Sequence, residues 1–102
     1  MKLIKNNPKN ASAIIIFYKN KVLLQKRDYL ENIFYPGYWG LFGGSKNNNE
    51  NYHSTIIREI KEEIDYKIDK KNLKYFIKLD LEFPTSKDNL SVKRYFFSYE
   101  IK

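Results

Sequence analysis

The sequence contains no cysteine, a single histidine and no long hydrophobic run. The absence of cysteine excludes a disulfide framework and any zinc site built on thiolates. No apolar stretch approaches the roughly 20 residues that a membrane-spanning helix needs. The first ten residues are too polar for the hydrophobic segment of a signal peptide. These absences favour a cytoplasmic protein, and a length of 102 residues supports one domain, residues 1–102.

Acidic residues are also scarce, with twelve Asp and Glu against nineteen Lys and Arg, so the net charge is +7. Such an excess is compatible with polyphosphate ligands, with nucleic acid, or with no more than a solvated lysine-rich surface. Apolar residues make up 42% of the chain and aromatic residues 17%, which is enough to bury a core. Nine Tyr and seven Phe favour an aromatic core and a fold that contains a sheet.

β-branched and aromatic runs in the first half of the chain predict short strands. Ala11–Tyr18 is interpreted as a buried strand, Lys19–Lys21 as a turn and Val22–Arg27 as the partner strand. A loop over Asp28–Tyr38 then leads to a short strand, Trp39–Phe42, which we expect to end at Gly43 and Gly44.

The second half of the chain predicts a helix followed by two strands. Asn51 is a suitable N-cap for a helix over Tyr52–Ile64, whose apolar positions share one face: Ile56, Ile57, Ile60 and Ile64. The strand-like runs Leu73–Phe83 and Ser91–Ile101 are joined by a turn over Pro84–Asn89. The order of strands, helix and strands suggests an α/β (α+β) domain, a mixed sheet with a helix on one face.

Carboxylates are concentrated on the predicted helix. Glu62 and Glu63 follow Glu59 by three and four positions, so the three carboxylates would line one side of it. Like charges at this spacing repel by about 0.2–0.5 kcal/mol per pair. A hard divalent cation would offset that repulsion, and Mg²⁺ fits because it accepts a few carboxylates, keeps water and binds phosphates. A solvated acidic surface is the alternative interpretation of this pattern taken alone.

The spacing in front of the helix decides between these interpretations. Gly44 is followed by five residues and Glu50, and seven more residues lead to Arg58-Glu59, an aliphatic residue, a free position and Glu62-Glu63. This pattern resembles the Nudix box, G-x5-E-x7-R-E-U-x-E-E-x-G-U, where U is aliphatic. The run that leads into the two glycines and the opening hairpin are similar to MutT-like members of the same family. The likeness covers residues 11–101.

The resemblance implies an α/β/α sandwich around a mixed sheet, with the box forming a loop–helix–loop. It also implies a Mg²⁺ cofactor, with Mn²⁺ as an alternative, held by Glu62, Glu63, Glu59 and the carbonyl of Gly43. Glu59 would be either a metal ligand or the base that takes a proton from water, and Glu62 would share the catalytic role.

The remaining positions of the box would support those carboxylates. Arg58, counted with the catalytic set, would orient them through charge-assisted hydrogen bonds, and Gly44 and Glu50 would complete the network. The implied reaction is attack by water on a phosphorus of a nucleoside di- or triphosphate derivative. The implied partner is therefore a small nucleotide, ordinary or oxidised, rather than a membrane or a nucleic acid.

Several side chains that are not among the defined positions of the box are candidates for substrate contact. Arg27 and Lys46 could meet phosphates, and Trp39, with Tyr35 and Tyr38, could stack on a nucleobase. Solvated cations and core aromatics are the alternatives. The single histidine, His53, is expected on the surface.

The sequence also departs from the family pattern. Asp65 and Tyr66 stand where the box has glycine and an aliphatic residue. A helix end there calls for a left-handed residue, which Asp tolerates at a cost of about 1 kcal/mol. Family members usually continue with a further strand and a C-terminal helix, so the predicted fold lacks that helix.

The missing C-terminal elements leave a second function open, a non-catalytic module that binds nucleotides or RNA. Some members carry another metal-binding glutamate in that region, and Glu82 and Glu100 are the late glutamates that could replace it. An incomplete sheet edge also favours a homodimer.

Overall fold

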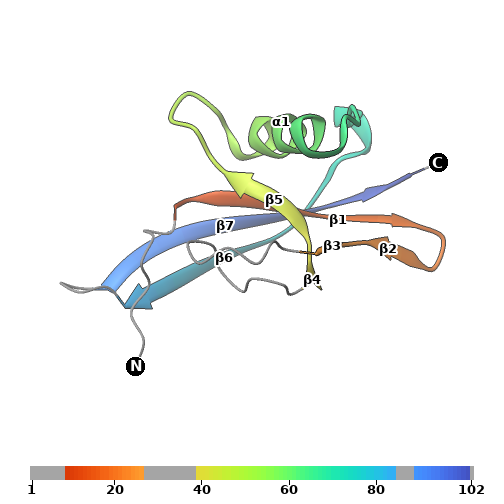
Figure 1. The fold of residues 1–102 in the computed structure, drawn as a ribbon. Coiled ribbons are helices and arrows are strands. Elements are labelled where there is room, and N and C mark those ends of the chain that lie inside the picture. Colours follow the sequence, from red (N-terminus) through yellow and green to blue (C-terminus); the bar gives the residue numbers. More distant parts are fainter. Residues whose placement is uncertain (1–8, 27–38, 85–88, 102) are drawn as a thin grey trace.

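The computed structural model describes residues 9–26, 39–84 and 89–101. Arg27, the predicted loop 28–38 and most of the predicted turn 84–89 therefore lie outside the described residues. Figure 1 shows the elements in chain order: β1 (Ala11–Tyr18), β2 (Lys21–Leu23), β3 (Gln25–Lys26), β4 (Trp39–Gly40), β5 (Phe42–Ser45), α1 (Tyr52–Ile64), η1 (Lys70–Asn72), β6 (Lys74–Pro84) and β7 (Asn89–Glu100).

A mixed sheet forms the centre of the fold, as the sequence predicts. Its order is β2-β1-β7-β6, and β5 pairs with the first half of β1. The pairing of β1 with β7 is parallel, from Ala11 opposite Arg94 to Phe17 opposite Glu100, whereas the other pairs are antiparallel. The short strands β3 and β4 form a separate ladder. The prediction of an α+β domain with a mixed sheet is confirmed.

The predicted hairpin partner, Val22–Arg27, is wrong as a single strand. Its first part belongs to β2, which pairs with β1, whereas β3 pairs with β4, and Leu24 lies between them. The turn consists of two residues instead of three, because Lys21 already pairs with Tyr18. Lys19 occupies the left-handed region at φ 53°, as short hairpin turns require.

The expectation that a strand ends at Gly43 and Gly44 is also wrong. Both glycines continue in β5 to Ser45, and the predicted strand Trp39–Phe42 is divided by Leu41 between β4 and β5. A Cβ at Gly43 would overlap the Ser12 carbonyl oxygen and the Ala13 Cα. Glycine therefore extends the pairing here, because only a residue without a side chain lets β5 approach β1 so closely.

Helix α1 has the predicted bounds and the predicted cap. The Asn51 Oδ1 accepts a hydrogen bond from the Ser54 N–H at 2.7 Å, which satisfies one of the free donors of the first turn. At the other end Asp65 adopts the left-handed conformation, with φ 55°. Its carboxylate pairs with Lys61, which lowers the Asp65 pKa. The left-handed Asp65 agrees with the prediction made from the family glycine.

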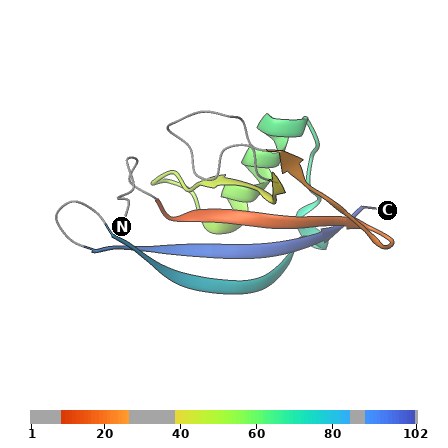
Figure 2. The same ribbon diagram turned by 60° about the horizontal axis from the view of Figure 1, so that its bottom comes forward.

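Helix α1 covers one face of the sheet, and the core lies between them (Figure 2). Ile56 and Ile60 are fully buried there, but Ile64 is 38% exposed, so the interpretation of Ile64 as part of the same buried face is wrong. Isoleucine supplies most of the core. The aromatic character that the sequence predicts comes from three core residues, Phe42, Phe97 and Tyr99. The buried cluster comprises Ile14, Ile16, Phe42, Ile56, Ile60, Ile68, Leu73, Phe97 and Tyr99.

The last two strands are displaced by one or two residues from their predicted bounds, and the one-turn helix η1 before β6 was not predicted.

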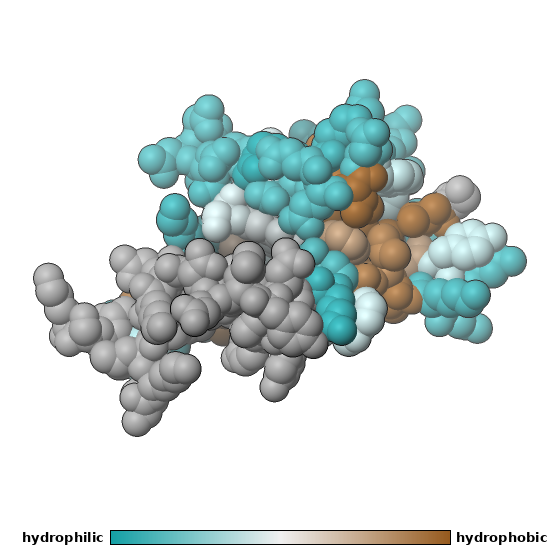
Figure 3. All heavy atoms as spheres, in the orientation of Figure 1, coloured by the Kyte–Doolittle hydropathy of each residue, from teal (hydrophilic) through white to brown (hydrophobic). Residues whose placement is uncertain are grey.

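The outer side of α1 is hydrophilic in Figure 3, as expected for a helix with one buried face. Within the described residues, no helix combines the length and apolarity needed to cross a bilayer.

Candidate active site

The candidate site lies where α1 packs against β5. Glu59 projects from the helix onto Gly44, and a Cβ built on this glycine would overlap all three atoms of the Glu59 carboxyl group. The Glu59 side chain is consequently only 16% exposed. Position 44, the first of the sequence motif, is therefore a glycine because the Glu59 carboxylate occupies the space that a larger residue's side chain would need.

The Arg58 guanidinium joins three carboxylates of the motif. Its Nε donates to the Glu50 Oε2 at 2.6 Å, and its Nη1 donates to the Glu59 Oε1 at 2.9 Å. The same Nη1 reaches both Glu62 oxygens at 3.3 Å. The Nη2 donates to the Glu50 Oε1 and to the Ser45 carbonyl, each at 3.0 Å. Arg58 thus offsets the repulsion between the glutamates with a fixed planar group.

Glu50 is the most strongly held of these carboxylates. Besides Arg58, it accepts hydrogen bonds from the Asn47 N–H at 3.0 Å and from the Thr55 hydroxyl at 3.2 Å. These donors, Arg58 first, lower the pKa of Glu50 from 4.5 to about 2. The same contact raises the pKa of Arg58, so both groups stay charged throughout the neutral range. The pair anchors the polar loop before α1 to the helix.

The lowered pKa of Glu50 predicts a loss of stability in acid. Because the folded-state pKa of about 2 lies below the ordinary value of 4.5, Glu50 contributes fully above pH 4.5. Its contribution declines as the pH falls from 4.5 towards 2. Urea unfolding of the wild type and of Glu50→Gln, measured at pH 7, 4 and 3, should show the difference between them shrinking at low pH. A constant difference between the two proteins across this range would contradict the assignment.

The other predicted metal ligands are more open to solvent. Glu62 is 57% exposed, and Glu63 is an exposed residue near the end of α1. Among residues 9–26, 39–84 and 89–101, no three acidic or histidine side chains converge in a ready-made metal site. The donor chemistry still fits a hard divalent cation, since the grouped side chains offer oxygens alone and two of them, Glu59 and Glu62, share one guanidinium nitrogen.

Comparison with known proteins agrees with this arrangement. The NUDIX domain family model matches residues 7–101. The chain belongs to the Nudix family. No significant match to a curated protein sequence was found.

Solved structures show that the Nudix fold extends over nearly the whole chain. A MutT/nudix family protein from Enterococcus faecalis matches with a TM-score of 0.71 and 21% identity, over 99% of this chain and 40% of its own. The NUDIX domain of Shewanella oneidensis NrtR, complexed with ADP ribose, matches with a TM-score of 0.70 and 16% identity, over 95% of this chain and 62% of its own. The E. coli dihydroneopterin triphosphate pyrophosphohydrolase matches with a TM-score of 0.68 and 16% identity, over 98% of this chain and 71% of its own. The chain thus spans less than two thirds of the length of the Enterococcus faecalis protein and of the Shewanella oneidensis domain.

The structure brings defined positions of the Nudix box together in the Arg58 network, whereas two of the predicted substrate residues, Trp39 and Lys46, lie in the described part of the chain. Trp39 is 66% exposed on β4, opposite Lys26. Lys46 lies before α1, where its Nζ donates to the Asn47 carbonyl at 3.2 Å and sits 5.8 Å from the centre of the Tyr52 ring. Arg27 is outside the described residues, as are Tyr35 and Tyr38.

Three further expectations concern residues that are not among the defined positions of the Nudix box. His53 is half-buried, and its ring lies 4.7 Å from that of Phe97, so the prediction of a surface residue is wrong. The structure places the late glutamates, Glu82 and Glu100, on exposed positions of β6 and β7. The hydrogen bonds of Arg58 described above involve neither of them, and their role as substitute ligands stays a prediction.

Sequence reasoning missed several residues that support the Nudix box without being among its defined positions. Thr55 is fully buried and donates to Glu50, and the Ser45 carbonyl accepts from Arg58. Ser12 is buried on β1 and donates to the Tyr52 carbonyl of α1 at 2.8 Å. Small hydroxyl residues in a strand or helix give no sequence signal of their own, because their role depends on which neighbour the fold brings near.

Proposed function

We propose that this protein is a Mg²⁺-dependent Nudix pyrophosphohydrolase that cleaves a phosphoanhydride bond of a nucleoside di- or triphosphate derivative. The Arg58 network carries the proposal, because it holds Glu50, Glu59 and Glu62 together beside Gly44. A purely structural acidic helix face would not need a carboxylate packed onto a glycine backbone.

Each residue of the site has a distinct proposed role. Glu62 and Glu63 would hold the ion, with the Gly43 carbonyl as a further oxygen donor, and Glu59 would be either a third ligand or the base. When bound, the ion supplies positive charge to the phosphate oxygens and acidifies a water molecule. Arg58 is a positioning residue, since it fixes the carboxylates through hydrogen bonds of 2.9–3.3 Å to Glu59 and Glu62.

The reaction requires water to attack one phosphorus while the bridging P–O bond breaks and its electrons leave with the departing phosphate. A carboxylate must accept the proton that the water loses. Glu59 is the best placed for this, because its side chain is the more shielded of the two carboxylates on Arg58 Nη1, at 16% exposed against 57% for Glu62. Shielding from water strengthens the interactions that position a reacting group.

The identity of the nucleotide is a separate part of the proposal. The structural relatives named above are connected with ADP ribose in one case and with dihydroneopterin triphosphate in another. Both compounds contain a phosphoanhydride bond and an attached heterocycle. We therefore propose the broad class of nucleoside diphosphates linked to another group and nucleoside triphosphates, ordinary or oxidised.

Turnover of a substrate panel tests this function. The panel should contain ATP, dGTP and its 8-oxo form, ADP ribose and a dinucleoside tetraphosphate, each assayed with Mg²⁺ and with a chelator. We expect at least one compound to release phosphate or pyrophosphate with Mg²⁺ and none to react without a divalent ion. Binding of these compounds without any hydrolysis would instead support the non-catalytic module.

A further inference from the structure

Strand β6 forms a long edge of the sheet in the part of the chain that the structure describes. It has eleven residues and pairs with β7 along one side, and Figure 2 shows it as the outermost strand. The strands at the opposite edge, β2 and β5, have three and four residues. Among the described edge strands, β6 therefore presents the longest row of backbone N–H and C=O groups to which another strand can add.

Side chains on β6 are open to solvent on both faces of the sheet. Every residue from position 74 to position 80 is exposed, because helix α1 packs mainly on β1 and β5. Contiguous exposed apolar side chains mark surfaces that bind a partner. On β6 the exposed apolar residues are Tyr75 (55% exposed), Phe76 (62%), Ile77 (43%) and Leu79 (39%).

Two charged residues in the middle of β6 lie on the helix side of the sheet. Lys78 is opposite Tyr95 of β7, whose ring stacks on that of Tyr52 in α1 with 3.8 Å between the ring centres. Residues directly opposite each other share a face, so Lys78 lies on the same side as α1. Asp80 does so too, because it is two positions farther along the strand. Their charged groups are 3.9 Å apart, from Nζ to Oδ2.

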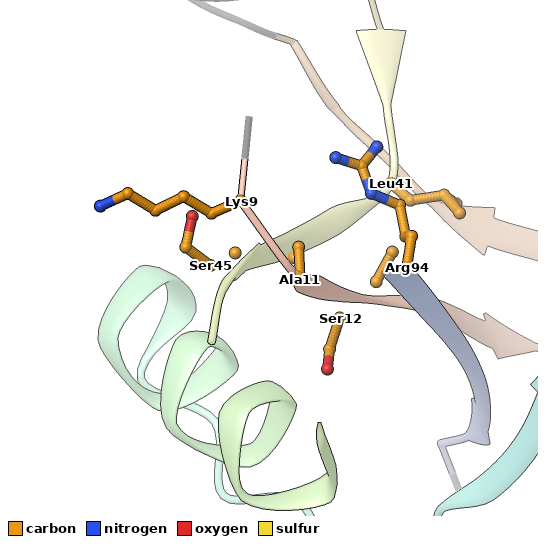
Figure 4. A pocket seen from close by; sticks show the side chains of 9 residues that line it. Lys9, Ala11, Ser12, Leu41, Ser45 and Arg94 are labelled. Carbon is orange, nitrogen blue, oxygen red and sulfur yellow. The ribbon is translucent and has the colours of Figure 1, made fainter. Parts of the chain in front are cut away.

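The aliphatic residues that alternate with these charges lie on the opposite face. Leu79 is opposite Arg94 of β7, and Figure 4 shows the Arg94 side chain on the side of the sheet away from α1. Ile77 and Leu81, each two positions from Leu79, share this face. The middle of β6 is thus aliphatic on one face and carries one charge of each sign on the other.

Two copies of this stretch match in charge when they pair antiparallel about Leu79. In that arrangement Lys78 of each copy lies opposite Asp80 of the other, so two cross-strand pairs of opposite charge form on the helix side. Charged side chains normally protect an edge strand from pairing with another chain. Here the pairing itself brings each charge to an opposite one, so the charges favour the contact.

The same arrangement also joins the aliphatic side chains. Ile77 lies opposite Leu81 of the other copy, and Leu79 lies opposite its own equivalent on the two-fold axis. The ladder of β6 with β7 is regular from Ile77 to Pro84, since its bulge lies between Tyr75 and Ile77. The paired strands would therefore form one continuous sheet with a shared aliphatic patch.

Neighbouring registers lack this match. Centring the pair on Lys78 sets two lysines opposite each other, and centring it on Asp80 sets two aspartates opposite each other, which is unfavourable. A shift by a single residue sets Lys78 against Leu79 and so mixes charged with aliphatic side chains on each face. The charge pattern of β6 therefore specifies one register and one kind of partner, a second copy of this chain.

We propose that β6 is the interface of a homodimer, in which two copies of this chain pair antiparallel about Leu79 and their sheets join. Such an interface uses the same surface on both copies and closes after two of them. It lies away from the Arg58 network, because β7 and β1 separate β6 from β5. Dimerisation through β6 therefore does not depend on the proposed function.

Sedimentation equilibrium of the full chain at about 0.15 M salt measures this association. We expect the wild type to form a reversible dimer. Lys78→Asp and Asp80→Lys should each raise the dimer Kd by about tenfold or more, because each sets two pairs of like charges opposite each other. An equimolar mixture of the two variants, one of them fluorescently labelled, should return to within about threefold of the wild-type Kd, since each acidic side chain then faces a lysine.

Lys21→Asp is the matched control, because it makes the same substitution on an exposed residue of β2, at the other edge of the sheet. It should leave the dimer Kd within about twofold of the wild type, and thermal unfolding verifies that every variant folds. A wild type that stays monomeric at about 0.1 mM, or a Kd that neither β6 variant changes, would overturn the interface. A mixture that associates as weakly as the single variants would overturn the pairing about Leu79.

Discussion

Replacing Glu59 by glutamine should lower kcat by a factor on the order of 10² to 10⁴, the usual contribution of a positioned acid–base group. Glutamine keeps the shape of the side chain and still offers an oxygen to the Arg58 Nη1, which now lies 2.9 Å from Glu59. It loses the negative charge that would bind a cation and the ability to accept a proton. The variant should therefore fold normally and bind a nucleotide, but hydrolyse it far more slowly.

Steady-state kinetics on the best compound of the substrate panel would measure this effect, with thermal unfolding to verify the fold. Asp80→Asn is the matched control, since it makes the same change of carboxylate to amide on an exposed residue of β6 that pairs with Lys78. A Glu59→Gln enzyme that keeps more than about a tenth of the wild-type kcat would exclude Glu59 from the reaction.

Adding one methyl group at each of the two glycines should separate stability from activity. The Cβ of Gly43→Ala would collide with the backbone at Ser12 and Ala13, which cannot move without breaking the pairing of β1 and β5. We expect the free energy of unfolding to fall by about 1–3 kcal/mol. The Cβ of Gly44→Ala would meet the end of the Glu59 side chain, which can rotate away, so this variant should keep most of its stability but lose activity.

Urea unfolding and kinetics on both variants would measure the separation. Displacing Glu59 takes it from its place beside Arg58, and a misplacement of about 1 Å can cost on the order of 100-fold in rate. If Gly44→Ala were as active as the wild type, the contact between Gly44 and Glu59 would have no part in catalysis. A Gly43→Ala protein of unchanged stability would show that β5 can shift away from β1.

The sequence predicts the helix and the motif better than it predicts the strands around them. The bounds of α1 follow from local signals, because Asn51 caps the helix and the buried isoleucines repeat at helical spacing. The division between β2 and β3 has no such signal. Leu24 sits in the middle of an apolar run, and only the separate pairing partners, β1 and β4, make the strand break there.

The candidate site shows the same limit at the level of side chains. The spacing of the glutamates predicts that they share one side of the helix, and the structure groups Glu59 and Glu62 around Arg58. The contact of Glu59 with Gly44 joins residues fifteen positions apart, and it exists because β5 and α1 pack together.

The parallel pairing of β1 with β7 sets the order in which the protein can mature. Residues near position 11 must wait for partners near position 94, and loops of this length close slowly because much chain entropy is lost before any contact forms. During synthesis, β1, β5 and α1 leave the ribosome first and have no parallel neighbour. A nascent chain whose β7 has not yet left the ribosome should therefore be inactive and open to proteases. Activity should appear only after Phe97 joins the core.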